Sequence, residues 1–431
     1  MRFFVFIFLA LFLFSCDNSG NYYGGDTPKQ EPDKENHDDN KQAEIDDNFD
    51  FSLATTELAV KTVKNTAACG KLVVVAGESD GVAHIIAFEE GEIKWHYKLN
   101  EHTAQSINTL ACENSDENAP VLLAGGDYSK GVDSPQTGFI SKHELSSGEL
   151  LSTIDIDADS SLSVYALLAD SEGNIFVGGR IEGPFDEEEN LGGQDGFVAK
   201  YSKENENIYI SQFGSKGFDS VQSLAMGSDG YLLAAGYSGG DIVTGAEKNS
   251  SGTMKGFVVK FKSDGAVHWK KMYSSSYFWQ ISTPLPSSFF VAGNVKKEEI
   301  SEGVAFRIGL DGNIMSTYSF PASKGSAVTG MDFDKNGNIY FTGYMEGNFE
   351  NGSAIPSVTG NLPDGNNIFL GIFKVKSAEL LYSALFGTKS HDINPKLAVD
   401  YRFSPHVFYY MVEDLSAAPQ KAEVTIFKKD N

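Results

Sequence analysis

Apolar residues recur along this chain in short runs, and most of these runs end in a glycine. Two of the runs belong to nearly the same phrase, SEGNIFVGGRIEG at 171–183 and KNGNIYFTGYMEG at 335–347. A phrase that marks a site would occur once or twice, whereas a phrase that marks a fold should recur with variation. Seven copies are found, with end points 48 to 68 residues apart: VVVAG (73–77), VLLAG (121–125), IFVGG (175–179), LLAAG (232–236), FFVAG (289–293), IYFTG (339–343) and the degraded VFYYM (407–411).

A second apolar run follows each copy, as in GFVAKY (196–201) and GFVVKF (256–261). In several units a turn containing glycine and another β-rich run come next, and one further run precedes the phrase. Each unit of about 50 residues therefore holds four short strand candidates, without helical periodicity. A four-stranded sheet repeated at this period is typical of a β-propeller blade, because such a sheet buries both apolar faces against its neighbours.

The number of copies predicts an all-β, seven-bladed β-propeller of four-stranded antiparallel blades, which forms one domain over residues 49–431. The last unit starts near Ile393, and the chain stops after its third strand candidate, AEVTIF (422–427). At the other end, NFDFSLATTEL (48–58) is a β-patterned run without a unit of its own. We therefore expect residues 49–55 to supply the outer strand of blade seven, which closes the ring and covers an exposed edge.

The chain begins with an apolar stretch, MRFFVFIFLALFLFSC, that is too short to span a membrane as a mature helix. It has a positive start at Arg2 and a small residue, Ser15, directly before Cys16. This stretch resembles a bacterial lipoprotein signal, which implies a signal peptide over 1–15 and a lipidated N-terminus at Cys16 that attaches the protein to a membrane. The alternative is an ordinary secretory signal with an incidental cysteine.

Residues 16–48 form a polar, acidic segment with almost no aliphatic side chains before Ile45. Such a composition cannot bury enough apolar surface to offset the entropy of ordering, so we expect a disordered acidic tether. The whole chain carries a net charge of −25. This balance argues against nucleic acid as a partner, because nucleic-acid binding needs a basic surface.

One pair of phrases carries a resemblance to a known family. FDSVQSLAMGSDGYLLAAGYSGG (218–240), followed by GFVVKFKSDGAVHW (256–269), resembles the bacterial β-propeller repeat (SBBP-like) family of secreted and surface proteins. The resemblance covers roughly residues 56–431 through degenerate repeats. It implies the propeller fold and a surface location, and it brings no catalytic residues, because the family shares no active-site motif.

Two stretches match the Gly-x-Ser-x-Gly pattern of serine hydrolases, GESDG (77–81) and GYSGG (236–240). A nucleophile elbow needs a helix after the serine, but in both places the next predicted element is a strand. The glycines are better explained as turn residues. The eight histidines show no zinc-binding spacing, and no glycine-rich phosphate loop opens a helix, so the sequence predicts neither a catalytic motif nor a cofactor.

DFDKNGN (332–338) begins like a calcium loop, with Asp332, Asp334 and Asn336 at alternate positions. Calcium takes six to eight oxygen ligands, including a carboxylate late in the loop, and here the twelfth position is Gly343. Asp and Asn before a glycine are also the expected residues of a turn between two strands. The stretch is therefore an incomplete calcium site, with a simple turn as the alternative.

Cys69 and Cys112 both end the predicted first strands of their blades, one and two. First strands of adjacent blades lie side by side around the channel, and an exported compartment favours oxidation. A disulfide between Cys69 and Cys112 is one interpretation, and two buried free thiols are the other.

The sequence leaves two functions open. The first is a non-enzymatic binding or scaffolding module, monomeric and anchored through Cys16 in the bacterial cell envelope, at the outer membrane or cell surface rather than the inner membrane. The second is an envelope or extracellular enzyme, a hydrolase or lyase, with its site at one end of the propeller channel. The long loops 180–195, 237–255 and 344–366 share one face of the ring, and variable loops on a rigid scaffold favour a protein or glycan partner there.

Overall fold

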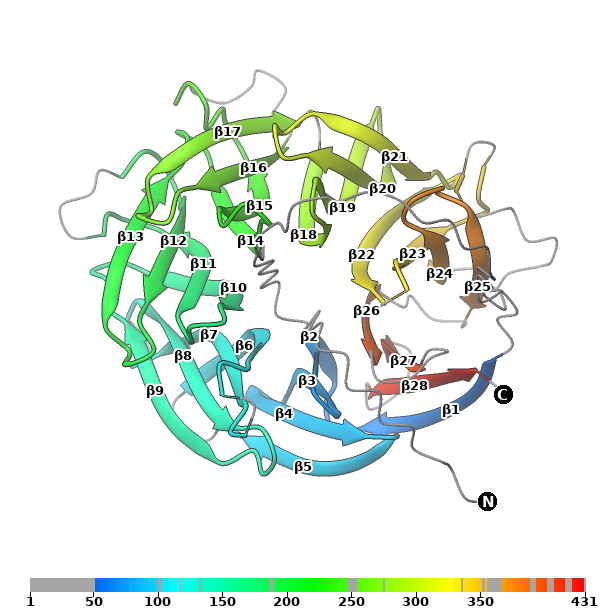
Figure 1. Ribbon diagram of the computed structural model, residues 1–431, viewed down its shortest axis with the longest axis horizontal. Helices are drawn as coiled ribbons and strands as arrows, with labels where there is room; N and C mark the ends of the chain where they lie inside the picture. Colours follow the sequence, from blue (N-terminus) through cyan, green and yellow to red (C-terminus); the bar gives the residue numbers. More distant parts are fainter. Residues whose placement is uncertain are drawn as a thin grey trace, which may run out of the picture.

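The computed structural model shows a ring of four-stranded sheets around a central opening (Figure 1). The first strand of each blade borders the opening, and the fourth forms the rim (Figure 1). The structure describes residues 51–429 except 100–102, 117, 132–133, 186–189, 246–253, 274–275, 335, 351–352, 355–365, 388–392, 401–406 and 415–420. The predicted signal peptide, the tether and Cys16 therefore lie outside the described residues.

Six blades are each formed from four consecutive antiparallel strands. From the first blade to the sixth they are β2 (Thr62–Cys69), β3 (Leu72–Ser79), β4 (Val82–Glu89), β5 (Glu92–Lys98); β6 (Thr103–Glu113), β7 (Val121–Ser129), β8 (Gln136–Glu144), β9 (Leu150–Ile156); β10 (Leu162–Ala169), β11 (Ile175–Ile181), β12 (Asp195–Tyr201), β13 (Asn207–Phe213); β14 (Asp219–Met226), β15 (Leu232–Ser238), β16 (Lys255–Phe261), β17 (Val267–Tyr273); β18 (Ser276–Leu285), β19 (Ser288–Lys297), β20 (Ile300–Gly309), β21 (Ile314–Phe320); β22 (Gly325–Phe333), β23 (Asn338–Glu346), β24 (Asn366–Lys374), β25 (Leu380–Gly387).

A further sheet, here called the closing sheet, joins the two ends of the chain. It has the strand order β1 (Phe51–Leu58), β28 (Lys421–Lys429), β27 (Val407–Asp414) and β26 (Ile393–Asp400). Strand β1 pairs antiparallel with β28 over eight positions, from Phe51↔Lys429 to Leu58↔Ala422. Figure 1 shows the two strands side by side at the rim, blue against red. This is the edge to which the sequence assigned residues 49–55, although the strand extends to Leu58.

The sequence predicted seven blades, and this number is corrected to six. Each of the six blades is one consecutive repeat, and each has a glycine at the end of its second apolar strand. The closing sheet is not a seventh repeat, because it takes its strands from both ends of the chain. The equivalent glycine is also missing from β27, the second strand of the closing sheet. Its register with β26 shifts between Ile393↔Glu413 and Lys396↔Met411.

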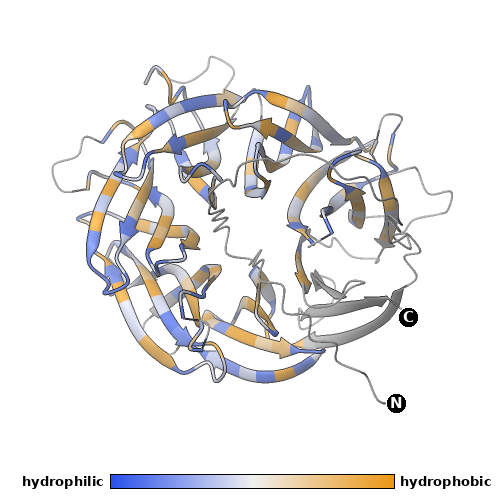
Figure 2. Ribbon diagram, in the orientation of Figure 1, coloured by the Kyte–Doolittle hydropathy of each residue, from blue (hydrophilic) through white to orange (hydrophobic). Residues whose placement is uncertain are grey.

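The core consists of apolar layers between adjacent blades. One such layer combines Leu123 and Ile140 of the second blade with Val164, Val177 and Phe197 of the third, all almost fully buried. Second and third strands bury both faces, so they appear as continuous apolar runs, whereas the outer strands alternate (Figure 2). Burial between neighbouring blades therefore explains why the repeated phrase is apolar at successive positions.

The glycine of the phrase has a separate cause, which is a β-bulge in the first strand of every blade. The register of β14 and β15 pairs Val221 with Gly236 and then Ser223 with Ala235, so that Gln222 is an extra residue. The same shift follows Val63, Ile107, Val164, Phe278 and Val328 in the other five blades. A bulge bends its strand and changes the direction of the extra side chain.

At the bulge, a carbonyl oxygen of the first strand lies unusually close to the glycine of the second strand. A Cβ atom at Gly236 would overlap the carbonyl oxygen of Ser220, and Gly126, Gly179, Gly293 and Gly343 meet the equivalent carbonyl in their own blades. A glycine at this position leaves room for that carbonyl, since it lacks a Cβ. The repeated phrase therefore ends in glycine because the bulge in the neighbouring strand requires it.

This contact predicts that Gly236→Ala destabilises the protein. The new methyl group must displace the backbone of β14, and we expect a loss of about 1–3 kcal/mol of unfolding free energy. Urea unfolding followed by circular dichroism measures it. Gly131→Ala is the control, because Gly131 lies outside a strand and an added Cβ would meet only the flexible Ser134 hydroxyl at 3.1 Å. Equal unfolding midpoints for the two variants would contradict the proposed role of the glycine.

The pairing of β1 with β28 predicts that removal of β1 opens the ring. A chain beginning at Val60 exposes the full edge of β28, so we expect a melting temperature lower by roughly 5 °C and aggregation through the free edge. Differential scanning calorimetry and light scattering compare it with the full chain. The closure hypothesis fails if the shortened chain melts at the same temperature and stays dispersed.

Candidate functional site

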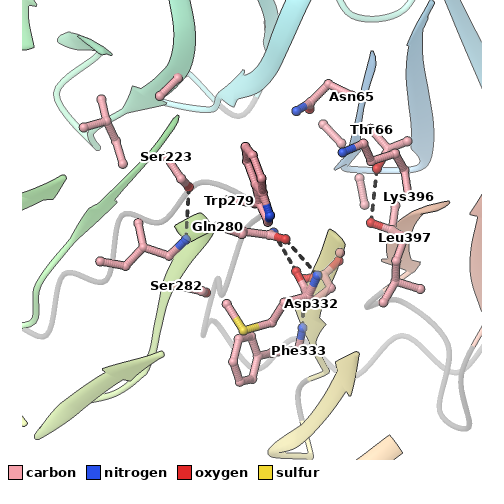
Figure 3. A pocket seen from close by; sticks show the side chains of 18 of the residues that line it. Asn65, Thr66, Ser223, Trp279, Gln280, Ser282, Asp332, Phe333, Lys396 and Leu397 are labelled. Atoms are coloured by element: carbon pink, nitrogen blue, oxygen red, sulfur yellow. Dashed lines mark hydrogen bonds between the residues drawn. The ribbon is translucent and has the colours of Figure 1, made fainter. Parts of the chain in front are cut away.

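The first strands of all the sheets surround a channel with a cavity of about 260 Å³. Its wall includes Asn65 and Thr66 from β2, Gln280 from β18, Asp332 from β22 and Lys396 from β26. Figure 3 shows these side chains converging from separate strands. The channel is thus the place where polar groups from distant parts of the sequence come together.

Many polar side chains of the channel connect neighbouring first strands, which are not paired with each other in one sheet. Gln280 of the fifth blade donates from Nε2 to the carbonyl of Met331 in the sixth (2.6 Å) and accepts from the Met331 amide (2.7 Å). Ser223 accepts from the amide of Ile281 (3.1 Å), which joins the fourth and fifth blades (Figure 3). These groups serve as links between blades.

The same kind of link holds the closing sheet. Thr329 of the sixth blade donates to the carbonyl of Pro395 (2.8 Å), and Thr66 of the first donates to the carbonyl of Leu397 (3.1 Å). The amide of Val399 donates to Asp332 Oδ2 (2.9 Å). Strand β26 is therefore fastened to the blades on both sides of it.

Two of the three residues of the incomplete calcium loop, Asp334 and Asn336, lie in the turn between β22 and β23. Asp334 accepts from the amides of Asn336 (2.8 Å) and Asn338 (3.0 Å) at Oδ1, and from Asn338 Nδ2 (2.8 Å) and the Tyr340 hydroxyl (3.1 Å) at Oδ2. Asp332 faces the channel and the closing sheet instead. Within the described part of the chain, no group of three or more His, Cys, Asp or Glu side chains could hold a metal. The hydrogen bonds of Asp334 match the alternative, a turn.

Cys69 and Cys112 form a disulfide between the first and second blades, with Cα atoms 5.6 Å apart. Both residues are fully buried. The bond links the ends of β2 and β6, as the hydrogen-bonding side chains do at other seams.

The serines of the two hydrolase-like stretches, Ser79 and Ser238, end the strands β3 and β15. The next element in each case is a strand, β4 or β16, so a nucleophile elbow is not formed. Ser238 is fully buried.

The β-bulges create a feature that the sequence analysis missed. Each bulge lies at the middle of a first strand or before its middle, toward the end of the channel at which the first strands begin, here called the mouth. The residue that follows each bulge glycine lies beside the bulge in the second strand. Together these positions form the mouth ring: the pairs Lys64/Glu78, Asn108/Asp127, Tyr165/Arg180, Gln222/Tyr237, Trp279/Asn294 and Thr329/Tyr344.

Two of these pairs are held by polar contacts. Asn108 Nδ2 donates to Asp127 Oδ2 (2.9 Å), and Trp279 Nε1 donates to Asn294 Oδ1 (3.1 Å). Asn108 also donates to the carbonyl of Val164 in the next blade (3.1 Å). The orientation of these side chains is therefore set before any ligand arrives.

Two other pairs bring charges to the mouth. The guanidinium of Arg180 lies over the Tyr165 ring, 5.3 Å from its centroid, and Lys64 Nζ lies 3.8 Å from Glu78 Oε2. Burial raises the pKa of Tyr165, so its hydroxyl keeps its proton at neutral pH. Burial also raises the pKa of Asp127, although Asn108, Arg180 and Lys64 oppose this shift. Most of the mouth ring remains half-buried or exposed.

The loop face lies at the same end of the channel, because the loops after β11, β15 and β23 follow the second strands there. Asp195, fully buried at the start of β12, accepts from the amide of Leu191 (2.9 Å) and from Gln212 Nε2 (2.7 Å). Gln212 also donates to the carbonyl of Gly183 (3.1 Å). Burial raises the pKa of Asp195. The described part of the loop 180–195 is thus fixed to the blade, whereas residues 186–189 lie outside the described residues.

One sequence signal could have located the mouth ring. The position after the glycine that faces each bulge holds Glu, Asp, Arg, Tyr, Asn and Tyr in the six blades, whereas most positions before it are small or apolar. A variable polar position inside an otherwise regular repeat indicates an accessible site. The partner in the first strand could not be found in this way, since it depends on the position of the bulge.

No protein-family model matches this chain, and no curated protein matches it either. Several solved structures resemble this chain in their fold. Raptor from Chaetomium thermophilum aligns with a TM-score of 0.54 at 10% identity, over 88% of this chain and 29% of that one. Hydrazine synthase from Kuenenia stuttgartiensis aligns with a TM-score of 0.50 at 10% identity, over 82% and 94%.

The WD40 domain of coronin from Toxoplasma gondii aligns at 10% identity with a TM-score of 0.47, over 88% of this chain and 87% of that one. The match to Raptor covers less than a third of the length of the Raptor chain. At such identities these likenesses concern the fold alone.

Among the described residues, no helix has the length and apolar character needed to span a membrane.

Proposed function

We propose that this protein is a lipoprotein of the bacterial cell envelope whose β-propeller is a non-enzymatic binding module. The lipoprotein part is supported by the positive start, the apolar stretch and the small residue before Cys16. The acidic segment that follows would hold the propeller away from the membrane. An outer-membrane or surface position is part of the same proposal, with the propeller acting as a monomer.

The observation that carries the binding function is the mouth ring. Six blades repeat one backbone geometry, yet the paired side chains at the bulge differ chemically from blade to blade. A rigid scaffold that presents different polar and aromatic groups at one opening is suited to recognition. The loops 180–195, 237–255 and 344–366 follow second strands at the same end of the channel, so a protein or glycan partner would contact both the loops and the mouth ring.

The contacts in the channel support binding over the enzyme alternative. A hydrolase or lyase site needs carboxylates or a base free to move protons. Asp332 instead accepts hydrogen bonds from the amides of Val399 and Phe333, and Gln280 bridges two blades. These side chains are engaged in holding the ring together.

Mouth variants test the binding function. We expect Arg180→Gln combined with Trp279→Ala to weaken capture of the natural partner at least tenfold. Trp279 lines the cavity and Arg180 lies over Tyr165, which also lines it, and Trp and Arg often carry most of the binding free energy. Surface plasmon resonance of the full chain against the captured partner measures this. Met315→Ala is the control, since Met315 is 58% exposed on the outer strand β21. Unchanged affinity in the double variant, with its fold intact, would place the partner on another surface.

The anchor has its own test. Cys16→Ser removes the sulfur to which lipid would be attached, so we expect the protein to leave the membrane fraction and to lose incorporation of labelled palmitate. Cys69→Ser is the comparison, because Cys69 is buried in the disulfide and should not affect labelling. Continued membrane association and labelling of the Cys16→Ser variant would refute anchoring through this residue.

A further inference from the structure

The mouth ring has an aromatic side, formed by the fourth and fifth blades. Tyr277 and Trp279 stack with 5.7 Å between ring centroids, and Tyr237 lies 5.8 Å from Trp279. Trp279 remains 37% exposed. Its indole is held by Asn294, which in turn donates from Nδ2 to the Ser301 hydroxyl (2.7 Å). The result is a fixed and partly exposed aromatic surface at the edge of the cavity.

The adjoining side of the ring is polar and comes from the second and third blades. Asp127 and Asn108 offer a carboxylate and an amide that are bonded to each other. Arg180 offers several N–H donors and lies over Tyr165. Gln222, between the two sides, has its Nε2 directed to the Ser220 hydroxyl at 2.7 Å. Donors and acceptors of the second and third blades therefore adjoin the aromatic surface of the fourth and fifth blades.

The charges at the mouth balance, in contrast to the rest of the molecule. The mouth ring contains two cations, Lys64 and Arg180, and two anions, Glu78 and Asp127, while the whole chain carries −25. Each of these groups has a partner within the ring. A site for an anion would need an excess of positive charge, and a site for a cation an excess of negative charge. The local balance favours an uncharged ligand.

We infer that the mouth binds a neutral carbohydrate, an inference that rests on the proposed binding function and gives its ligand class. The C–H face of a sugar ring packs on an aromatic surface such as Trp279 and Tyr237, while its hydroxyl groups bond to carboxylate, amide and guanidinium groups. The cavity of about 260 Å³ lies below the ~300–1,000 Å³ that hold drug-sized ligands. The ligand therefore enters with one end, so that a terminal sugar occupies the mouth.

The test is isothermal titration calorimetry of the full chain with defined oligosaccharides. The neutral probes are cellohexaose, laminarihexaose, maltohexaose and the hexamer of N-acetylglucosamine, and the anionic probes are hexagalacturonate and a heparin hexasaccharide. We expect at least one neutral probe to give a saturable heat of binding and to bind equally well at low and high salt, because screening affects only charged partners. Trp279→Ala should lower its affinity at least about tenfold, and Trp279→Phe should lower it less.

The outcomes separate the ligand class from the site. Met315→Ala should bind the neutral probe like the unchanged chain. Binding of anionic probes alone, or of no neutral probe up to millimolar concentration, overturns the carbohydrate inference. In that case the proposed binding function still stands if capture of the natural partner depends on Arg180 and Trp279. If a neutral probe binds but Trp279→Ala does not weaken it, the mouth is not the site, and the inference is overturned as well.

Discussion

The shape of all six blades depends on the close approach of two backbones. A carbonyl oxygen of the first strand lies against the α carbon of a glycine in the second strand. An ordinary residue at Gly236 or Gly343 would push these strands apart, and the bulge would be lost. Without the bulge, Gln222 and Thr329 would follow the regular alternation of the strand. The glycine therefore fixes the direction of the side chains that reach the channel, although it makes no contact with anything in the channel itself.

This arrangement separates the residues that build the ring from those that give it chemical character. The apolar layers, the disulfide of Cys69 and Cys112 and the bridges through Gln280 and Thr66 hold neighbouring blades together. The mouth ring lies on this frame and can vary, because most of its side chains are partly exposed and contribute little to the buried layers. A substitution at Arg180 or Trp279 changes what the opening presents while the blades beneath stay as they are. Repetition of a scaffold with variation at one position is how propellers acquire different partners.

The sequence predicted the β-propeller and its strands because burial on both faces leaves a strong signal in each unit, as in VVVAG and LLAAG. It predicted the segment before Leu58 as an edge strand because that run had no unit of its own. It did not reveal that Glu78 lies beside Lys64, or Arg180 beside Tyr165, since these neighbours depend on a register shifted by one residue at the bulge. The count of seven blades failed because the degraded run VFYYM, which has no glycine, was counted as a repeat equal to the other six.

The pairing of Phe51 with Lys429 also sets the order of events in folding. Strand β1 is among the first described parts of the chain to be synthesised, and its partner β28 is the last, so β1 waits unpaired while six blades form. The entropy of closing so long a loop grows only slowly with its length, so the delay is kinetic and the closed state is little penalised. During that interval β1 and the incomplete closing sheet both expose free edges, which can pair with another copy of the chain. A ring whose last seam joins β1 to β28 is therefore most vulnerable to domain exchange just before β28 is synthesised.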